Sequence, residues 1–305
     1  MKYKQIDLEQ IIEFLGNDVF ATYGITDSVV IDNIPDAGQV NESSLDWLNS
    51  TRPNKQEDAE KSKAHVLVVD ASVDYSEALK EQGKVLIVVE SPRKTIAQIA
   101  SRFFLEKPAS GIHPSAIIDE EAIIDPTAYI SAGCVIGKAS VGAGTVLMPN
   151  VVVYDDVKIG SNCLVQAGAV IGTDGLGCIR DAEGRLTKFP HLGGVYIGNN
   201  VEIGANCQIA KGAFSDTIIE NGCKLNGLCF VAHNCHLYEN VWITGDTMLC
   251  GSVLVNKNTT IFSNVIIREQ RVIGERSIIG MGSVVTKNVP DGETWIGAPA
   301  HRMEK

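Results

Sequence analysis

Two residues of a repeating segment can place a proton acceptor and a backbone donor one above the other. His233 and Gly251 are eighteen residues apart. If the chain coils with eighteen residues per turn, the Gly251 amide lies about one strand spacing, roughly 4.8 Å, from the His233 backbone. Acyl transfer to an amine needs such a pair, because the imidazole takes the amine proton while the N–H holds the oxyanion. His233 follows Val231 by two positions and is expected to face outward, so a solvated surface histidine is the alternative.

A metal site is the other chemistry open to these histidines. His233 and His236 are three residues apart on a bending strand rather than on a helix face. A third zinc ligand would have to be His191, from a loop. This spacing suits zinc poorly, and we predict that no metal is bound.

The elements that position these residues are predicted by a period of six. From residue 197 to residue 279 aliphatic residues recur every sixth position in two registers: Ile197, Ile203 and Ile209, then Ile219, Leu225, Val231, Leu237, Ile243, Leu249, Val255, Ile261, Ile267, Ile273 and Ile279. Three six-residue strands close a triangular coil whose aliphatics fill the interior. Chance clustering in a Val/Ile-rich β protein is the alternative, but one slip in register would turn a side chain to the wrong face.

The period also occurs earlier and is interrupted once. It appears between Ile118 and Ile171, with one step of five residues, and stops between Gly172 and Tyr196. We expect a coil over residues 108–289 with a loop extruded at about 173–195. Insertions in repeat proteins gather on the binding face.

Residues 1–107 lack the period and predict a separate small α/β domain. Leu8–Leu15 and Pro92–Phe104 have apolar residues at helical spacing, whereas residues 28–32, 65–70 and 84–89 are typical of strands. No dinucleotide fingerprint or P-loop lysine is present, which argues against those functions. Residues 290–305 are expected to leave the repeat as a tail, with no room for a long helical extension.

Composition excludes several classes of protein. With 305 residues and 45% hydrophobic content the chain can bury a large core. Its formal net charge of −11 argues against a nucleic-acid partner. No apolar run approaches a membrane span and the first residues lack the pattern of a signal peptide, so we expect a soluble cytoplasmic protein. The eight cysteines form no CxxC pair and are expected to be packing residues.

Several stretches resemble one known family. They are VESPRKTIAQIA in the first domain, HPSAIID, GTDGLG, KFPHLGG and FVAHN. The chain resembles the UDP-3-O-(3-hydroxyacyl)glucosamine N-acyltransferases of lipid A assembly, within the left-handed β-helix acyltransferases. The resemblance implies a mainly β fold, a left-handed parallel β-helix of hexapeptide repeats, and a homotrimer with grooves between subunits.

The resemblance also assigns roles to residues. The histidine of the family's AHN motif is the general base and falls on His233, and the oxyanion donor falls on Gly251. The family's first domain stacks uracil on an aromatic residue near an asparagine, which implies nucleotide binding by Trp47 and Asn49. From the sequence without the family, Trp47 is equally well a core residue.

The departures from the family pattern are expected to change the substrate. Glu269 stands where the family has a second histidine, and Asn226-Gly227 stands where the family has Asp-Asn before the AHN motif. Glu269 and Asn226 are expected to contact the substrate. These two residues, with Asp174 and His236, are the candidates for substrate binding. The family's C-terminal helices, which help to recognise acyl carrier protein, have no counterpart here. The tail instead resembles that of coenzyme A-dependent sugar acetyltransferases.

The first hypothesis is therefore an N-acyltransferase with a modified substrate. It would move a short or 3-hydroxyacyl group from a thioester, acyl-coenzyme A rather than acyl carrier protein, to the amine of a UDP- or dTDP-linked amino sugar, with no permanently bound cofactor. Three alternatives stay open: the lipid A N-acyltransferase using acyl carrier protein, a sugar acetyltransferase using acetyl-coenzyme A, and a non-catalytic scaffold.

Overall fold

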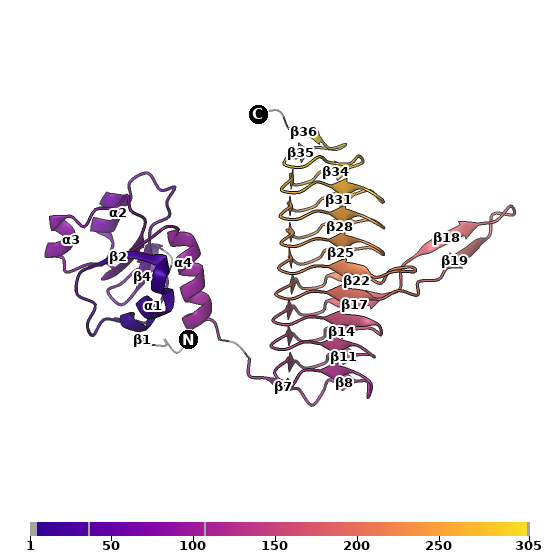
Figure 1. Ribbon diagram of the computed structural model, residues 1–305, viewed down its shortest axis with the longest axis horizontal. Coiled ribbons are helices and arrows are strands. Elements are labelled where there is room, and N and C mark those ends of the chain that lie inside the picture. Colours follow the sequence, from indigo (N-terminus) through magenta and orange to yellow (C-terminus); the bar gives the residue numbers. More distant parts are fainter. Residues whose placement is uncertain (1–4, 36, 107, 304–305) are drawn as a thin grey trace. The chain divides into compact units, whose positions relative to one another are not determined.

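The chain folds into two compact units, residues 1–107 and 108–305 (Figure 1). The computed structural model describes residues 5–35, 37–106 and 108–303. The helices among them are too short or too polar to cross a membrane.

The first unit is an α/β domain built on a four-stranded sheet of order β2-β6-β5-β4. Strands β4, β5 and β6 are parallel and β2 is antiparallel to β6, so the carboxyl ends of β4 and β5 meet at one edge. The strands are β1 (Ile6–Asp7), β2 (Val19–Tyr23), β3 (Val30–Ile31), β4 (Leu45–Trp47), β5 (Val66–Val69) and β6 (Val85–Val89). The helices are α1 (Leu8–Leu15), α2 (Lys55–Lys61), α3 (Glu77–Glu81) and α4 (Pro92–Ile99), with helical turns η1 (Gly16–Asp18), η2 (Ala37–Gln39) and η3 (Ala100–Phe104).

The second unit is a parallel β-helix with three flat faces, each named here after its first strand. The β7 face contains β7 (Gly111–Ile112), β10 (Tyr129–Ile130), β13 (Val146–Leu147), β16 (Leu164–Val165), β21 (Glu202–Ile203), β24 (Lys224–Leu225), β27 (Trp242–Ile243), β30 (Thr260–Ile261), β33 (Ile278–Ile279), β35 (Thr294–Ile296) and β36 (His301–Arg302). The β8 face contains β8 (Ile117–Ile118), β11 (Val135–Ile136), β14 (Val152–Val153), β17 (Val170–Thr173), β22 (Gln208–Ala210), β25 (Phe230–Val231), β28 (Met248–Leu249), β31 (Ile266–Ile267) and β34 (Val284–Val285). The β9 face contains β9 (Ile123–Ile124), β12 (Ser140–Val141), β15 (Val157–Ile159), β20 (Val195–Ile197), β23 (Thr217–Ile219), β26 (His236–Leu237), β29 (Leu254–Val255) and β32 (Val272–Ile273).

The period of six is confirmed as the source of the core. Ile243, Leu249 and Val255, taken from three successive strands, are completely buried. Residues eighteen apart pair in register, as Ile243 does with Ile261. The next coil passes so close that a β-carbon added at Gly204, the residue after Ile203, would lie 2.3 Å from backbone atoms. This close approach explains why the position after the aliphatic is often small.

The chain turns at corners built on a left-handed residue, three positions after the aliphatic. Asn234, which follows Val231 in this way, has φ 58°. Asparagine is among the few residues other than glycine that adopt this conformation at low cost. It recurs at the corners as Asn150, Asn162, Asn200, Asn206, Asn234, Asn240, Asn258 and Asn264.

Two segments depart from the simple coil. Between β17 and β20 the chain forms an extruded antiparallel hairpin, β18 (Gly177–Arg180) and β19 (Leu186–Phe189), which projects from the β-helix in Figure 1. Sequence analysis expected residues 290–305 to leave the repeat as a tail. The chain instead continues the β-helix after Pro290. Strand β35 pairs in parallel with β33, and β36 closes the face in antiparallel fashion.

The two residues of β33 provide a test of the core. Ile279 is completely buried whereas its neighbour Ile278 is 39% exposed. Ile279→Ala should lower the free energy of unfolding by about 2–5 kcal/mol, because it leaves a cavity. Ile278→Ala, the matched control, should cost less than about 1 kcal/mol. Urea unfolding of both variants checks this, and equal losses would contradict the assignment of inner and outer faces.

Candidate active site

His233 lies at the corner between β25 and β26 and is half-buried. Its Nδ1 is 3.1 Å from Oδ1 of Asn234. The orientation of that amide is fixed by its other partners, since Oδ1 accepts the Ala213 N–H at 3.0 Å and Nδ2 donates to the Ser215 carbonyl at 3.0 Å. His233 Nδ1 must therefore be the donor to Asn234. The lone pair of the neutral imidazole is then on Nε2, which is the atom able to accept a proton.

Gly251 lies directly above His233 on the next coil. Strands β25 and β28 pair in register, and the Ser252 N–H donates to the His233 carbonyl at 2.9 Å. A β-carbon added at Gly251 would lie 2.6 Å from both Cε1 and Nε2 of His233. The basic nitrogen thus rests against Gly251. The Gly251 N–H has no acceptor within the part of the chain that the structure describes, so it is available to a ligand.

Glu269 continues the same column one coil further. Strand β31 pairs with β28, and the Gln270 N–H donates to the Gly251 carbonyl at 2.9 Å. The side chain of Glu269 is exposed and contacts Arg268 at 3.1 Å. Its own backbone N–H and Arg268 hold the pKa of the Glu269 carboxyl below its ordinary value. An ionised carboxylate therefore stands beside the His233 and Gly251 pair.

The extruded segment brings two further groups to His233. The ring of His191 lies 5.1 Å from the ring of His233, centroid to centroid. Asp174 approaches His191, with Oδ1 3.8 Å from Nδ1. A hydrogen bond from Lys188 holds the pKa of Asp174 below its ordinary value. Asp174, a substrate-binding candidate from the sequence, contacts His191 and not His233. Sequence analysis had considered His191 only as a possible metal ligand.

Two other candidates lie elsewhere on the β-helix. His236 is on β26, where its Nε2 is 2.7 Å from Glu220 Oε1 and its ring stacks on Tyr238 at 3.9 Å. Asn226 is exposed at a different corner, between β24 and β25, and its Oδ1 accepts the N–H of Gly227. Within one chain the fold does not bring Asn226 to His233.

Trp47 and Asn49 lie in the first unit, at the carboxyl end of β4. Trp47 is half-buried and packs against the apolar cluster of that unit. Asn49 is also half-buried and begins the loop that leads to α2. Open α/β sheets bind ligands at this edge, and the partial exposure of Trp47 suits either stacking or core packing.

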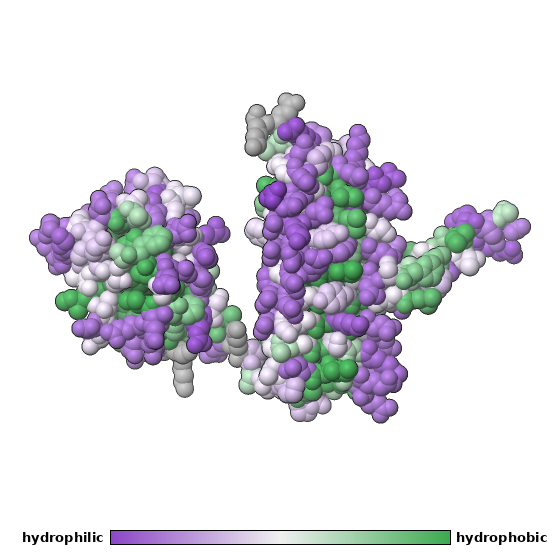
Figure 2. Space-filling model, in the orientation of Figure 1, coloured by the Kyte–Doolittle hydropathy of each residue, from purple (hydrophilic) through white to green (hydrophobic). Residues whose placement is uncertain are grey.

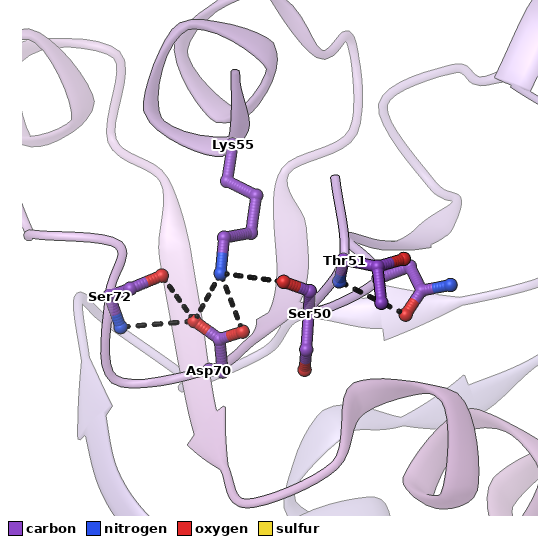
Figure 3. A network of polar contacts seen from close by, with 6 residues as sticks. Ser50, Thr51, Lys55, Asp70 and Ser72 are labelled. Carbon is purple, nitrogen blue, oxygen red and sulfur yellow. Dashed lines mark hydrogen bonds and ion pairs between the residues drawn. The ribbon is translucent and has the colours of Figure 1, made fainter. Parts of the chain in front are cut away.

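A polar network holds the loop after Asn49 (Figure 3). The Lys55 ammonium contacts Oδ2 of Asp70 at 2.7 Å and the Ser50 carbonyl at 3.2 Å, and Asp70 also accepts the Ser72 N–H. Burial alone would raise the pKa of Asp70, but the hydrogen bonds from Lys55 and Ser72 outweigh it and keep the pKa well below its usual range. Sequence analysis did not single out Lys55 or Asp70, because the two are fifteen residues apart and form no motif.

No group of three His, Cys, Asp or Glu side chains with the geometry of a metal site occurs in residues 5–35, 37–106 and 108–303. His191 and His233 meet ring against ring, and His236 pairs with Glu220. The chemistry of the site is instead that of an imidazole next to a backbone N–H.

Comparison with known proteins places the chain in a family. Residues 138–173 match the bacterial transferase hexapeptide family (six repeats). The UDP-3-O-acylglucosamine N-acyltransferase of Bordetella pertussis is 33% identical over 275 residues, which cover 81% of this chain and 75% of that protein. The chain belongs to the UDP-3-O-acylglucosamine N-acyltransferase family. The protein of this name from Coxiella burnetii is 34% identical over 186 residues, 54% of each chain, so the match spans about half the length of that relative.

Solved structures support the same fold. LpxA of Acinetobacter baumannii has a TM-score of 0.56 and 28% identity over 63% of this chain and 73% of its own. The family's fold is the left-handed parallel β-helix expected from the resemblance.

Proposed function

We propose that this protein transfers an acyl group from the thioester of an acyl carrier protein to the amine of a UDP-3-O-acylglucosamine. The observation that carries the proposal is the contact of His233 Nε2 with Gly251, with the imidazole tautomer set by Asn234. Acylation of an amine requires a base and a free N–H close together, and here they lie on adjacent coils. The acceptor follows from the names of the relatives.

The reaction proceeds by addition and elimination at the thioester carbonyl. The amine nitrogen attacks the carbonyl carbon while His233 Nε2 accepts the amine proton. The Gly251 N–H donates to the oxyanion of the tetrahedral intermediate. The C–S bond then breaks, the amide forms, and the leaving thiolate takes the proton from His233. Nothing is oxidised or reduced, and the imidazole returns to its starting state.

One observation favours a second candidate, transfer of a short acyl group from coenzyme A to a different nucleotide-linked amino sugar. The Glu269 carboxylate stays ionised one coil from Gly251. A negative charge there opposes a substrate phosphate and suits a hydrogen bond to a sugar hydroxyl or amine. The two candidates therefore differ in which substrate group faces Glu269.

The test is thiol release over a grid of substrates. Acetyl, 3-hydroxybutyryl and long-chain 3-hydroxyacyl donors, on coenzyme A or on acyl carrier protein, are each combined with UDP-3-O-acylglucosamine and with UDP- or dTDP-linked amino sugars. Turnover with carrier-protein donors and the acylated UDP-glucosamine supports the first candidate. Turnover confined to short coenzyme A donors and another amino sugar supports the second. No thiol release with any pair would refute both and leave a non-catalytic scaffold.

Nucleotide binding by Trp47 can be tested apart from chemistry. Stacking of a base on an aromatic side chain is worth about 1–3 kcal/mol. Trp47→Ala should therefore raise the KM for the UDP-linked sugar at least fivefold and leave kcat close to that of the native protein. Trp47→Phe is the matched control and should retain most of the affinity. If Trp47→Ala lowers the unfolding temperature without changing uridine diphosphate binding in calorimetry, Trp47 is a core residue.

A second requirement of the proposed site is assembly into a homotrimer. The outward residues of the β8 face form one column of register-paired side chains that is apolar apart from Gln208: Ile117, Val135, Val152, Val170, Gln208, Phe230, Met248, Ile266 and Val284. Figure 2 shows this face as a hydrophobic band along the β-helix. Ile117 is 68% exposed and Met248 43%. A continuous exposed apolar column of this kind marks an interaction surface. This supports packing of three copies along the column.

Ile266→Glu should break that assembly. A carboxylate in the middle of the apolar column would lose its water on association without gaining a partner. The expected result is a fall in mass from three subunits to one, measured by light scattering, together with loss of thiol release. The matched control is Thr260→Glu, an outward residue of β30 on the β7 face, which should stay trimeric. A native protein that already sediments as one subunit would contradict the groove between copies.

A further inference from the structure

His191 is buried at the base of the extruded hairpin with half of its hydrogen-bonding capacity unused. It is 4% exposed. Its Nδ1 lies 3.1 Å from the Phe189 carbonyl, which can only accept, so Nδ1 carries the proton. Its Nε2 is buried and has no partner among the residues that the structure describes. Buried polar atoms are rarely left unpaired without a functional reason, and packing alone would be served as well by an apolar residue.

The surroundings of His191 hold its ring in one orientation. With the proton on Nδ1, the buried Nε2 carries a lone pair that faces no donor among the residues that the structure describes. The nearest carboxylate, Asp174, lies 3.8 Å from Nδ1 and is itself neutralised by Lys188, with Lys211 also nearby. A β-carbon added at Gly175 would lie 2.4 Å from His191 Nε2, so only a glycine at this position leaves room for the imidazole.

The ring of His191 packs against the ring of His233. The His191 and His233 rings meet at 5.1 Å and 69°, which is the edge-to-face arrangement that aromatic rings prefer. His233 is thus held at two places, by Asn234 at Nδ1 and by His191 through its ring contact. Together these contacts keep Nε2 next to Gly251. Glu269, one coil beyond Gly251 in the same column, is paired with its neighbour Arg268.

We propose that His191 is a positioning residue that orients His233 and stabilises its imidazolium while the amine proton is held there. The proposal rests on the proposed function, because it assigns His191 a role only through His233. A polar imidazole ring is a better neighbour for a developing cation than hydrocarbon, because a charge is costly next to purely apolar groups. On this proposal, the function of the extruded segment is to place the His191 ring, which is outside the repeat, against His233.

The test compares two replacements of similar size. His191→Leu fills the space but offers no polar neighbour, and should lower kcat about tenfold, the scale of one aromatic contact, with KM unchanged. His191→Gln offers an amide and should recover most of the loss. In the His233→Ala background, His191→Leu should have no further effect on kcat. Equal activity of the native protein and His191→Leu, or an equal loss in both backgrounds, would overturn the proposal.

Gly175→Ala is an independent variant that disturbs the His191 ring without replacing His191. The added methyl group pushes on His191 Nε2 and should lower kcat to the level of His191→Leu. In a His191→Ala background the methyl has room, and the substitution should cost nothing more. A loss in kcat that persists in the double variant would place the effect of Gly175 elsewhere and count against the proposal.

A spectroscopic readout separates this proposal from the function on which it rests. Imidazole nitrogen resonances of the native protein should report His233 as a single Nδ1–H tautomer, and His191→Leu should shift or broaden them. If no donor supports turnover but this change occurs, the proposed function fails and the positioning role stands. If turnover occurs and neither the resonances nor kcat respond to His191→Leu, only the positioning role fails.

Discussion

His233→Ala is expected to lower kcat about 10²–10⁴-fold, which is the usual contribution of a general base. The variant removes the imidazole whose Nε2 accepts the amine proton in the proposed reaction. The corner itself should survive, because Asn234 keeps its hydrogen bonds to Ala213 and Ser215. KM for both substrates should therefore change little, and the unfolding temperature should stay close to that of the native protein.

Steady-state thiol release measures this effect, and His113→Ala is the matched control. His113 is an exposed histidine near the start of the β-helix, bonded to Ser115, and its loss should leave kcat unchanged. Full activity of His233→Ala would show that another group accepts the proton. A drop in unfolding temperature that matches the loss of activity would instead make His233 a structural residue.

The second large effect is expected from Gly251→Ala. The backbone of Gly251 is outside the left-handed region, so alanine is allowed there, but its methyl group would lie 2.6 Å from Cε1 and Nε2 of His233. The imidazole must then move away from the Gly251 N–H, which we propose as the donor to the oxyanion. Loss of an oxyanion donor costs about 10²–10³-fold in kcat, and we expect a fall of at least that size because base and donor are separated together.

A double variant isolates the steric cause. Gly251→Ala alone should lower the unfolding temperature slightly, whereas in the His233→Ala background the methyl has room and should cost no stability. Gly38→Ala, at a glycine of the first unit with open space around it, is the control for the exchange itself. If Gly251→Ala keeps native kcat, the contact between Gly251 and His233 has no part in the reaction.

Local patterns were sufficient to predict most of the fold. The aliphatic repeat predicted the buried residues of the β-helix, as at Ile243 and Ile267, because neighbouring residues of a strand face opposite sides and a shift by one residue would expose the aliphatic. Helical spacing likewise predicted α1, and apolar runs predicted β5 and β6. The segment after Pro290 was predicted wrongly as a tail. The pairing of β35 with β33 depends on contacts across a turn that the period does not encode.

Some residues of the candidate site could likewise be predicted from the repeat, and others could not. The separation of eighteen residues placed Gly251 next to His233 before any coordinates were known, because the coil length converts distance along the chain into a neighbour in space. No such rule covers the extruded segment. Its hairpin returns His191 to the base from forty-two residues away, and Asp174 reaches the site only with it.

The sequence by itself thus determined the repeat, its buried face and the stacked pair of His233 and Gly251, all of which follow from periodicity. Only the tertiary structure decided the tautomer of His233, through the amide of Asn234, and the contact with His191. It also separated Asn226 from His233 by putting them at different corners. The physical reason is that hydrogen-bond direction and the path of an insertion are set by the packing of the whole coil, which no local spacing records.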